Sequence, residues 1–324
     1  MTAPGSAVAP ILYRSPGLAY GAVMLGVLGH ASSEFVAVLT GVSGPEQSVW
    51  RFLLGGLGLV VIALLVPASR DLWTPLRERF AALVGLSLLG VTGGYLLFHW
   101  SLDFATVPQV AILVTTIPIF VALVNAAVSQ QWPAPAKLLT GAAAVLGVAL
   151  LITDGYLARL AGSTQSLVGV LLATGCAALV AAFTVLVRPI IGQYGALRIT
   201  AITLFLGALG LWLVVGLAWG IWVNPATLTQ RPPEQVTALV ALALWNTTIT
   251  QWLWIGGLAA VPDITRGSYL FFLKPIIATG LAVGLLQQGV TGIQLWAMAI
   301  ICGAVVVEFC WPRRESPTAV GKAP

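Results

Sequence analysis

Charged side chains are scarce in this chain. Its 324 residues include 15 Lys+Arg and 10 Asp+Glu, which is 8% of the sequence, whereas a soluble globular protein carries about 25%. This scarcity argues against an ordinary soluble enzyme and against a disordered protein. A net charge of +5 is also spread too thinly along the chain to form a basic surface for nucleic acid.

Histidine and cysteine are also rare. The two His and three Cys (Cys176, Cys302 and Cys310) follow no metal-ligand spacing and no disulfide pattern. Phosphate-loop, HExxH and GxSxG motifs are missing. We therefore expect no metal, no cofactor and no enzymatic activity.

Long apolar runs are what the chain does have. Hydrophobic residues make up 59% of the sequence, the mean hydropathy is +0.98, and a bilayer core needs about 20 mostly apolar residues per helix. The apolar residues do not alternate with polar ones as they do in the strands of a membrane β-barrel, so we expect an all-α membrane protein. Ten transmembrane helices are predicted, at 17–39, 47–66, 81–103, 107–128, 137–153, 167–187, 196–223, 236–258, 266–286 and 292–311.

The basic residues between these spans predict the orientation. With the N-terminus inside, the cytoplasmic segments hold 11 Lys and Arg residues, and the opposite side holds three, Arg51, Arg159 and Arg231. Both termini are therefore expected in the cytoplasm, as tails of residues 1–16 and 312–324 around a multi-pass protein of the inner (plasma) membrane. We expect the first helix to be retained, because no convincing cleavage site follows the N-terminal segment.

An internal repeat divides the chain into halves. Pro118 is followed by Gln130-Gln131 and Pro275 by Gln287-Gln288, both at the same spacing, and the two prolines lie 157 residues apart. We expect repeats of five helices at 17–153 and 167–311, joined by a loop at 154–166. An odd helix number inverts the second repeat, and inverted repeats with proline-broken helices are typical of transporters with a midplane site.

Three stretches of the sequence then resemble a known family. Gly90–Leu102 with Thr116–Leu123, and Tyr269–Ala278 in the second half, resemble the third, fourth and ninth helices of EamA-domain transporters of the drug/metabolite transporter superfamily. The resemblance covers about residues 17–311. It implies ten helices in two inverted EamA repeats and secondary transport, often export, of small metabolites. The sequence departs from the family pattern at Ala31-Ser-Ser-Glu34 and at Lys274.

Lys274 is the most informative charge inside a predicted span. An ammonium near a helix centre costs about 2.5–3.5 kcal/mol on insertion scales, so it normally faces a cavity or a partner. One interpretation is that it binds a substrate carboxylate or phosphate, aided by a Phe271 carbonyl that Pro275 frees. The other is internal pairing with an acid such as Glu34, or snorkelling to the interface.

Both histidines have an acid four residues later, on the same helix face. The pairs are His30 with Glu34 and His99 with Asp103. One interpretation is a proton relay, because histidine changes its charge near neutral pH. The other is that each pair satisfies polar groups at a helix interface or an aqueous mouth.

Aromatic and polar residues gather on the third, eighth and ninth spans. Some of the aromatics are expected to line a cavity and the others to pack or to lie in the interfacial belt; they include Phe98, Trp245, Trp254, Phe271 and Phe272. The predicted substrate-binding residues are Lys274, Glu34, His99, Tyr95, Trp252, Gln251, Asn246 and Tyr269.

These observations predict a secondary transporter working by alternating access. The expected substrates are small metabolites such as amino acids or related anionic, zwitterionic or aromatic compounds, with export the expected direction and protons a candidate coupling ion. No nucleic-acid partner is expected, and the protein is expected to be a monomer or homodimer in the lipid bilayer. The alternatives are a lipid-carrier flippase and an intramembrane lipid-modifying enzyme.

Overall fold

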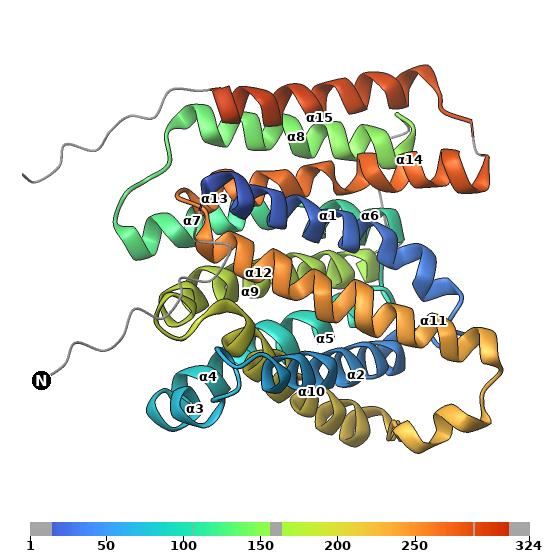
Figure 1. The fold of residues 1–324 in the computed structure, drawn as a ribbon. Coiled ribbons are helices and arrows are strands. Elements are labelled where there is room, and N and C mark those ends of the chain that lie inside the picture. The colour runs from blue at the N-terminus through green and yellow to red at the C-terminus, as the bar shows by residue number, and fades with distance from the viewer. Residues whose placement is uncertain (1–14, 106, 156–163, 288, 311–324) are drawn as a thin grey trace, which may run out of the picture.

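The computed structural model describes residues 15–105, 107–155, 164–287 and 289–310. Within these ranges the chain is helical and contains no strand, and ten helical segments are long and apolar enough to cross a membrane. The expected all-α fold with ten spans is therefore confirmed. Figure 1 shows the helices as a bundle in which segments from both halves of the chain alternate.

Five spans come from the first half of the chain. They are α1 (Pro16–Val38); α2 (Gly44–Leu65); α4 (Phe80–Leu86) continuing through the π-helical turn η2 (Ser87–Gly93) into α5 (Gly94–Ser101); α6 (Val107–Val114) with α7 (Ile117–Ser129); and α8 (Pro135–Thr153). A short helix, α3 (Trp73–Glu78), precedes α4.

Five spans come from the second half. They are α9 (Thr164–Tyr194); α10 (Ala196–Trp219); α11 (Pro233–Ala243), the π-helical turn η5 (Leu244–Ile249) and α12 (Thr250–Ala260); α13 (Ile264–Ser268), the 3-10 turn η6 (Tyr269–Leu273) and α14 (Lys274–Leu286); and α15 (Gly292–Cys310). A 3-10 turn, η4 (Pro225–Gln230), precedes α11.

The sixth span is longer than the sequence predicts. Residues 167–187 were expected because Arg188 and Pro189 should end an apolar helix, yet α9 continues to Tyr194 with Pro189 inside it. Arg188 donates from Nε to the carbonyl of Ala259 at 3.2 Å and from Nη2 to that of Val261 at 2.6 Å. The charge is thus satisfied by carbonyls beside the helix, which can continue past it.

The two halves share irregular backbone at a constant register. The π-helical turns begin at Ser87 and Leu244, which are 157 positions apart, and α7 and α14 keep the same offset. Gln130 and Gln287 follow these helices in the left-handed conformation, with φ of 57° and 53°, and such a residue commonly ends a helix. The repeat is therefore present in the backbone as well as in the sequence.

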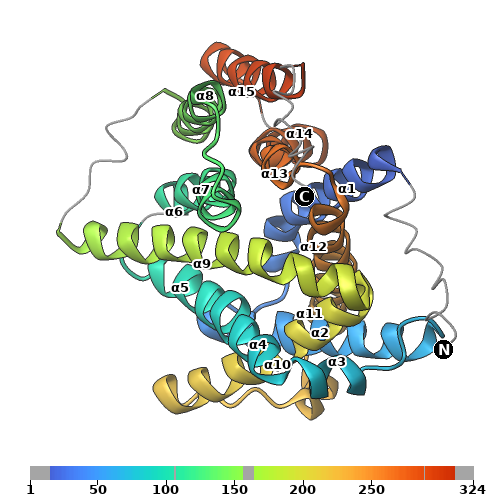
Figure 2. The ribbon, with the colours of Figure 1, turned by 90° about the vertical axis from the view of Figure 1, so that its left-hand side faces the viewer.

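Helices of the two repeats pack against one another in pairs. α1 packs along α12, α2 along α10, α5 along α9, and α8 along α15 at one edge of the bundle (Figures 1 and 2). Gly29 permits the first pairing, because a Cβ atom built there would lie only 1.8 Å from Oγ1 of Thr250. Each repeat therefore depends on the other for its core.

Candidate functional site

One cavity of about 400 Å³ lies between the two repeats. Its walls come from α1, α2, α5, α6, α9, α12 and the turn from η6 into α14. The lining reaches the connection between α1 and α2 at Ala37, Val38, Ser43 and Gly44. We call this end of the bundle the mouth. We call the opposite end, where α7 ends and α13 begins, the closed end.

The cavity extends from the mouth to about mid-depth. In the first repeat its lining comes from the C-terminal halves of α1 and of the third span, and from the N-terminal halves of α2 and of the fourth span. Because consecutive spans are antiparallel, these halves all lie toward the mouth. The lining also includes Phe271 and Lys274, at the break where η6 passes into α14.

Two cationic side chains, Arg51 and Lys274, line this cavity. Arg51, half-buried on α2, donates from Nε to Oγ1 of Thr247 at 3.0 Å and from Nη2 to the carbonyl of Asn246 at 2.9 Å. Lys274, half-buried at the start of α14, places its ammonium 5.9 Å from the centre of the Phe271 ring. Positive charge from both repeats therefore converges on one cavity.

Polar side chains connect the walls. The amide of Gln251 donates to the Tyr95 hydroxyl oxygen at 2.6 Å, between α12 and α5. His99 is buried, with Nδ1 2.5 Å from Oγ of Ser48 and 2.9 Å from the carbonyl oxygen of Tyr95. The His99 ring is thereby fixed against α2.

Aromatic rings surround the deeper part. His30 makes edge contacts with Trp254 and Phe271, with ring centres 5.8 and 5.6 Å apart, and Trp254 and Phe271 are themselves 5.1 Å apart. Phe98 also lines the cavity. The site therefore combines fixed positive charge with flat apolar surfaces, a mixture that suits a small molecule with an anionic group and an apolar or ring-shaped body.

The structure brings five predicted residues to the cavity, namely Lys274, His99, Tyr95, Gln251 and His30. The backbone of α1 is described through position 34, but the side chain of Glu34 lies outside the described residues. Its predicted roles in substrate binding and proton transfer stay predictions.

Three predicted substrate-binding residues do not line this cavity. Gln251, Trp254 and Ile255 line it from one helix face, so Trp252 is turned about 100° away from Gln251 and packs against the core. Asn246 is fully buried and donates to the carbonyl of Gly29 at 2.7 Å and to Oγ of Ser32 at 2.9 Å. Tyr269 instead donates to the carbonyl of Lys137 toward the closed end.

The remaining predictions concern backbone and proton transfer. Pro118 and Pro275 both occupy the first turn of a helix, α7 and α14, where a missing N–H costs nothing. The carbonyl of Phe271, expected to be free, accepts the main-chain N–H of Lys274. Asp103 is exposed in the turn after α5, whereas His99 is buried against Ser48, so these two side chains have different surroundings.

Arg51 is the main residue that sequence reasoning missed. The loop-charge count places it on the outer side as a topology charge, although it falls within the predicted span 47–66. A charge inside a span is a site candidate by default, and that signal was available. Ser48, one turn before Arg51 on α2, carries no comparable signal.

The fold and this cavity define a two-repeat membrane transporter. A family model, the EamA-like transporter family, matches residues 17–153 and 167–309. This chain therefore belongs to the EamA-like transporter family.

Known structures agree with the fold. A protein of known crystal structure aligns with a TM-score of 0.75 and 20% sequence identity, over 90% of this chain and 96% of its own. In total, 26 solved chains match. At this identity the likeness concerns the fold alone. No curated protein matches the chain.

Proposed function

We propose that this protein is a secondary transporter, working as an exporter, for small anionic or zwitterionic metabolites, including aromatic ones. The observation that carries the proposal is that Arg51 and Lys274, one from each repeat, line the same cavity. A cation inside a membrane protein normally marks a substrate or ion pathway. A substrate anion between these groups would contact both repeats, whose relative movement gives alternating access.

The size and lining of the cavity support a small solute as the substrate. A volume of about 400 Å³ lies in the range of pockets for small molecules, roughly 300–1,000 Å³. Trp254 and Phe271 offer aromatic surface in the same cavity, and the Lys274 ammonium lies 5.9 Å from the Phe271 ring centre. A lipid-carrier flippase would need its headgroup site to open sideways to the bilayer, whereas this lining reaches the α1–α2 connection at one end of the bundle.

The proposed orientation follows from the loop charges. With both termini in the cytoplasm of a cell with an inner (plasma) membrane, α1 runs outward and the mouth faces the outside. The state described here would then be the one that releases an exported substrate.

A ligand screen with matched variants tests the proposal. Purified protein is heated with a panel of amino acids, aromatic and aliphatic organic anions, sugars and amines, and Tm is recorded. A ligand at about 100 times its Kd adds about 2.7 kcal/mol to stability, so true ligands raise Tm clearly. We expect the hits to be anionic or zwitterionic, and we expect Lys274→Ala to lose the shift while its ligand-free Tm stays close to that of wild type.

Transport in proteoliposomes then completes the test. Lys274→Ala should abolish uptake of a hit, and Lys274→Arg should retain part of it. Arg231→Ala is the matched control, because Arg231 pairs with Glu46 at 3.1 Å and does not belong to the cavity lining. Hits confined to amines or lipids, or full uptake by Lys274→Ala, would contradict the proposal.

A further inference from the structure

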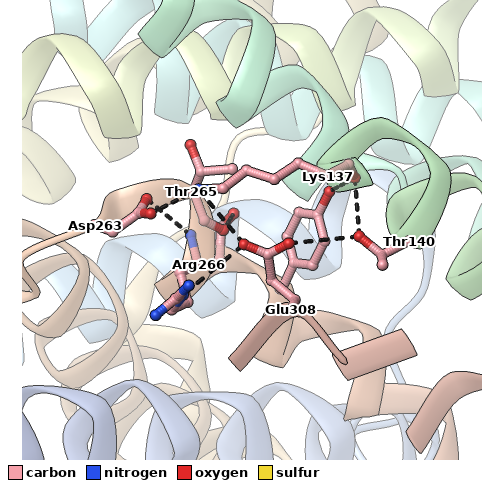
Figure 3. Close-up of polar contacts among 8 residues, drawn as sticks. Lys137, Thr140, Asp263, Thr265, Arg266 and Glu308 are labelled. Atoms are coloured by element: carbon pink, nitrogen blue, oxygen red, sulfur yellow. Dashed lines mark hydrogen bonds and ion pairs between the residues drawn. The ribbon is translucent and has the colours of Figure 1, made fainter. Parts of the chain in front are cut away.

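A cluster of charged residues lies at the end of the bundle opposite the mouth, and Figure 3 shows the contacts among them. The ammonium of Lys137 lies 2.6 Å from Oδ2 of Asp263 and 3.4 Å from Oε1 of Glu308. Nε of Arg266 lies 3.9 Å from the same oxygen of Glu308. Oγ1 of Thr140 lies 3.5 Å from the other oxygen of Glu308. The Glu308 side chain is only 2% exposed, so its charge depends on these neighbours.

The cluster joins the two repeats. Lys137 belongs to α8 of the first repeat, whereas Asp263, Arg266 and Glu308 belong to the second. Tyr269 of η6 adds a hydrogen bond to the carbonyl of Lys137. Asp263 also accepts the main-chain N–H of Arg266 at 3.1 Å and so caps α13. A single lysine thus ties α8 to both α13 and α15.

The cluster lies next to the contact between α7 and α13 at the closed end of the bundle. α7, which precedes Lys137, packs against α13, which follows Asp263. At the mouth the equivalent segments by the repeat register are α14 and α6, and their described residues form no comparable contact. The fourth and ninth spans therefore meet at the closed end and diverge at the mouth, with the ion pairs at the end where they meet.

The sequence at the mouth could not reproduce this cluster. A shift of 157 positions pairs Lys137 with Gln294 and Asp263 with Thr106, and it pairs Arg266 with Gln109 and Glu308 with Leu151. Four charged residues thus correspond to four neutral ones. If the two repeats exchanged conformations, the closed end would open and Lys137 would separate from Asp263, while the mouth would close without an equivalent set of ion pairs.

We propose that this cluster, which we call the closed-end lock, makes the mouth-open state the resting state of the ligand-free protein. Separating Lys137 from its partners leaves the buried carboxylate of Glu308 with less compensation, and an uncompensated buried charge is strongly unfavourable. The positions equivalent by the repeat register are neutral, so they cannot form the same set of ion pairs to oppose opening of the mouth. The ligand-free protein therefore has a lower free energy in the mouth-open state than in the mouth-closed state. Substrate binding has to overcome this difference.

Among the residues that the structure describes, one further ion pair between the repeats is present, and it lies at the mouth. Arg231 reaches Glu46 at 3.1 Å, with side chains 23% and 34% exposed. These residues belong to α2 and to the segment before α11, and α2 and α11 pack against each other in one wall. The ion pair therefore holds α2 and the segment before α11 together in the mouth-open state and does not span the mouth. It provides a control for the loss of an inter-repeat ion pair as such.

Two positions related by the repeat report the state. Ala111 lines the cavity near the mouth, and its counterpart Ser268 is fully buried at the closed end. In a protein with Cys176, Cys302 and Cys310 replaced by Ala, Ala111→Cys and Ser268→Cys each supply a single thiol. A water-soluble maleimide in detergent solution should label Ala111→Cys quickly and Ser268→Cys slowly.

The lock is then weakened in each reporter protein. Lys137→Met removes the shared cation, and Asp263→Asn removes one charge while keeping a residue that can cap α13. We expect labelling of Ser268→Cys to accelerate by about fivefold or more and labelling of Ala111→Cys to slow down. Lys137→Arg, which keeps the charge, and Arg231→Met, which breaks the other pair, should behave like the unaltered reporters.

Three results would overturn the proposal. The first is unchanged labelling of both reporters in folded Asp263→Asn protein. The second is faster labelling of Ser268→Cys without slower labelling of Ala111→Cys, which would indicate local loosening of the closed end. The third is an equal effect of Arg231→Met. The inference assumes alternating access from the proposed function, but labelling needs no substrate, so a wrong substrate class and a wrong lock give different results.

Discussion

The hydroxyl oxygen of Tyr95 accepts a hydrogen bond from the side-chain amide of Gln251 at 2.6 Å. Tyr95 belongs to α5 of the first repeat and Gln251 to α12 of the second, and both line the cavity. The bond therefore joins the repeats within the proposed binding site. A substrate that moves either side chain would therefore change a contact between the two repeats.

Replacing Tyr95 by Phe tests this link. The change removes the acceptor and leaves the Gln251 amide without this partner, which should cost about 1 kcal/mol of stability. We expect a lower ligand-free Tm and weaker ligand binding. Tyr194→Phe is the matched control, because its hydroxyl bonds to Glu78 at 2.5 Å on the exposed surface, where such changes stay within about 0.5 kcal/mol. Equal effects of the two changes would contradict a special role for the Tyr95–Gln251 bond.

The contribution of Arg51 to ligand binding should depend on the shape of its guanidinium group as well as on its charge. Its guanidinium bonds to the Thr247 hydroxyl and the Asn246 carbonyl, and the shorter, single ammonium of lysine cannot reproduce both bonds and the same position. We expect Arg51→Lys to weaken binding of an anionic ligand by about tenfold and Arg51→Met to weaken it further. Calorimetric titration of a hit from the ligand screen measures both. If Arg51→Met kept full affinity for the ligand, Arg51 would not contribute to ligand binding.

The fold was accessible from sequence because the membrane imposes a strong and simple rule. Each span must be apolar over about 20 residues, so the ten spans could be counted, and the count is confirmed. Pro118, Pro275 and the glutamines after them revealed the repeat because backbone breaks require particular residues. The two π-helical turns have no such marker, since they arise where neighbouring helices accommodate an extra residue.

The residues of the site were harder to predict from the sequence, because the rotation of each helix about its axis decides which of its side chains line the cavity. Gln251 and Trp252 are adjacent in sequence, yet only the first lines the cavity. Lys137 and Arg266 are among the 11 Lys and Arg residues that the predicted topology assigns to the cytoplasmic segments, whereas the structure places both in the closed-end lock. Sequence can count charges along a span, but pairing between repeats requires the packed structure.

The close approach of α1 to α12 predicts a large cost for a very small change. A methyl group at Gly29 would overlap with Oγ1 of Thr250, at 1.8 Å, and that hydroxyl is held by the carbonyl of Trp245 at 2.7 Å. We expect Gly29→Ala to destabilise the protein by about 1–3 kcal/mol, measured as a lower Tm. Gly21→Ala, on the same helix with open space around it, should leave Tm unchanged or higher. The same Tm for both variants would contradict the tight packing of α1 on α12.

The pH dependence of the closed-end lock follows from Asp263, which lies outside the spans. Burial alone would raise the pKa of its carboxyl group, but the Lys137 ammonium and the Arg266 N–H outweigh burial and hold the pKa below its ordinary value. A carboxyl group with a lowered folded-state pKa adds stability that is complete above its unfolded pKa, about 3.9, and is lost as the pH falls through the folded value.

The difference in Tm between wild type and Asp263→Asn should therefore stay constant from about pH 5 to pH 8 and shrink only below about pH 4. Asp71→Asn is the matched control, because the pKa of the exposed Asp71 carboxyl group is lowered mainly by the main-chain N–H of Thr74, with a smaller contribution from the Arg198 guanidinium. Its effect on Tm should be smaller at every pH. A difference for Asp263→Asn that already disappears between pH 5 and pH 7 would show that the ion pair with Lys137 does not hold this carboxylate in its charged form.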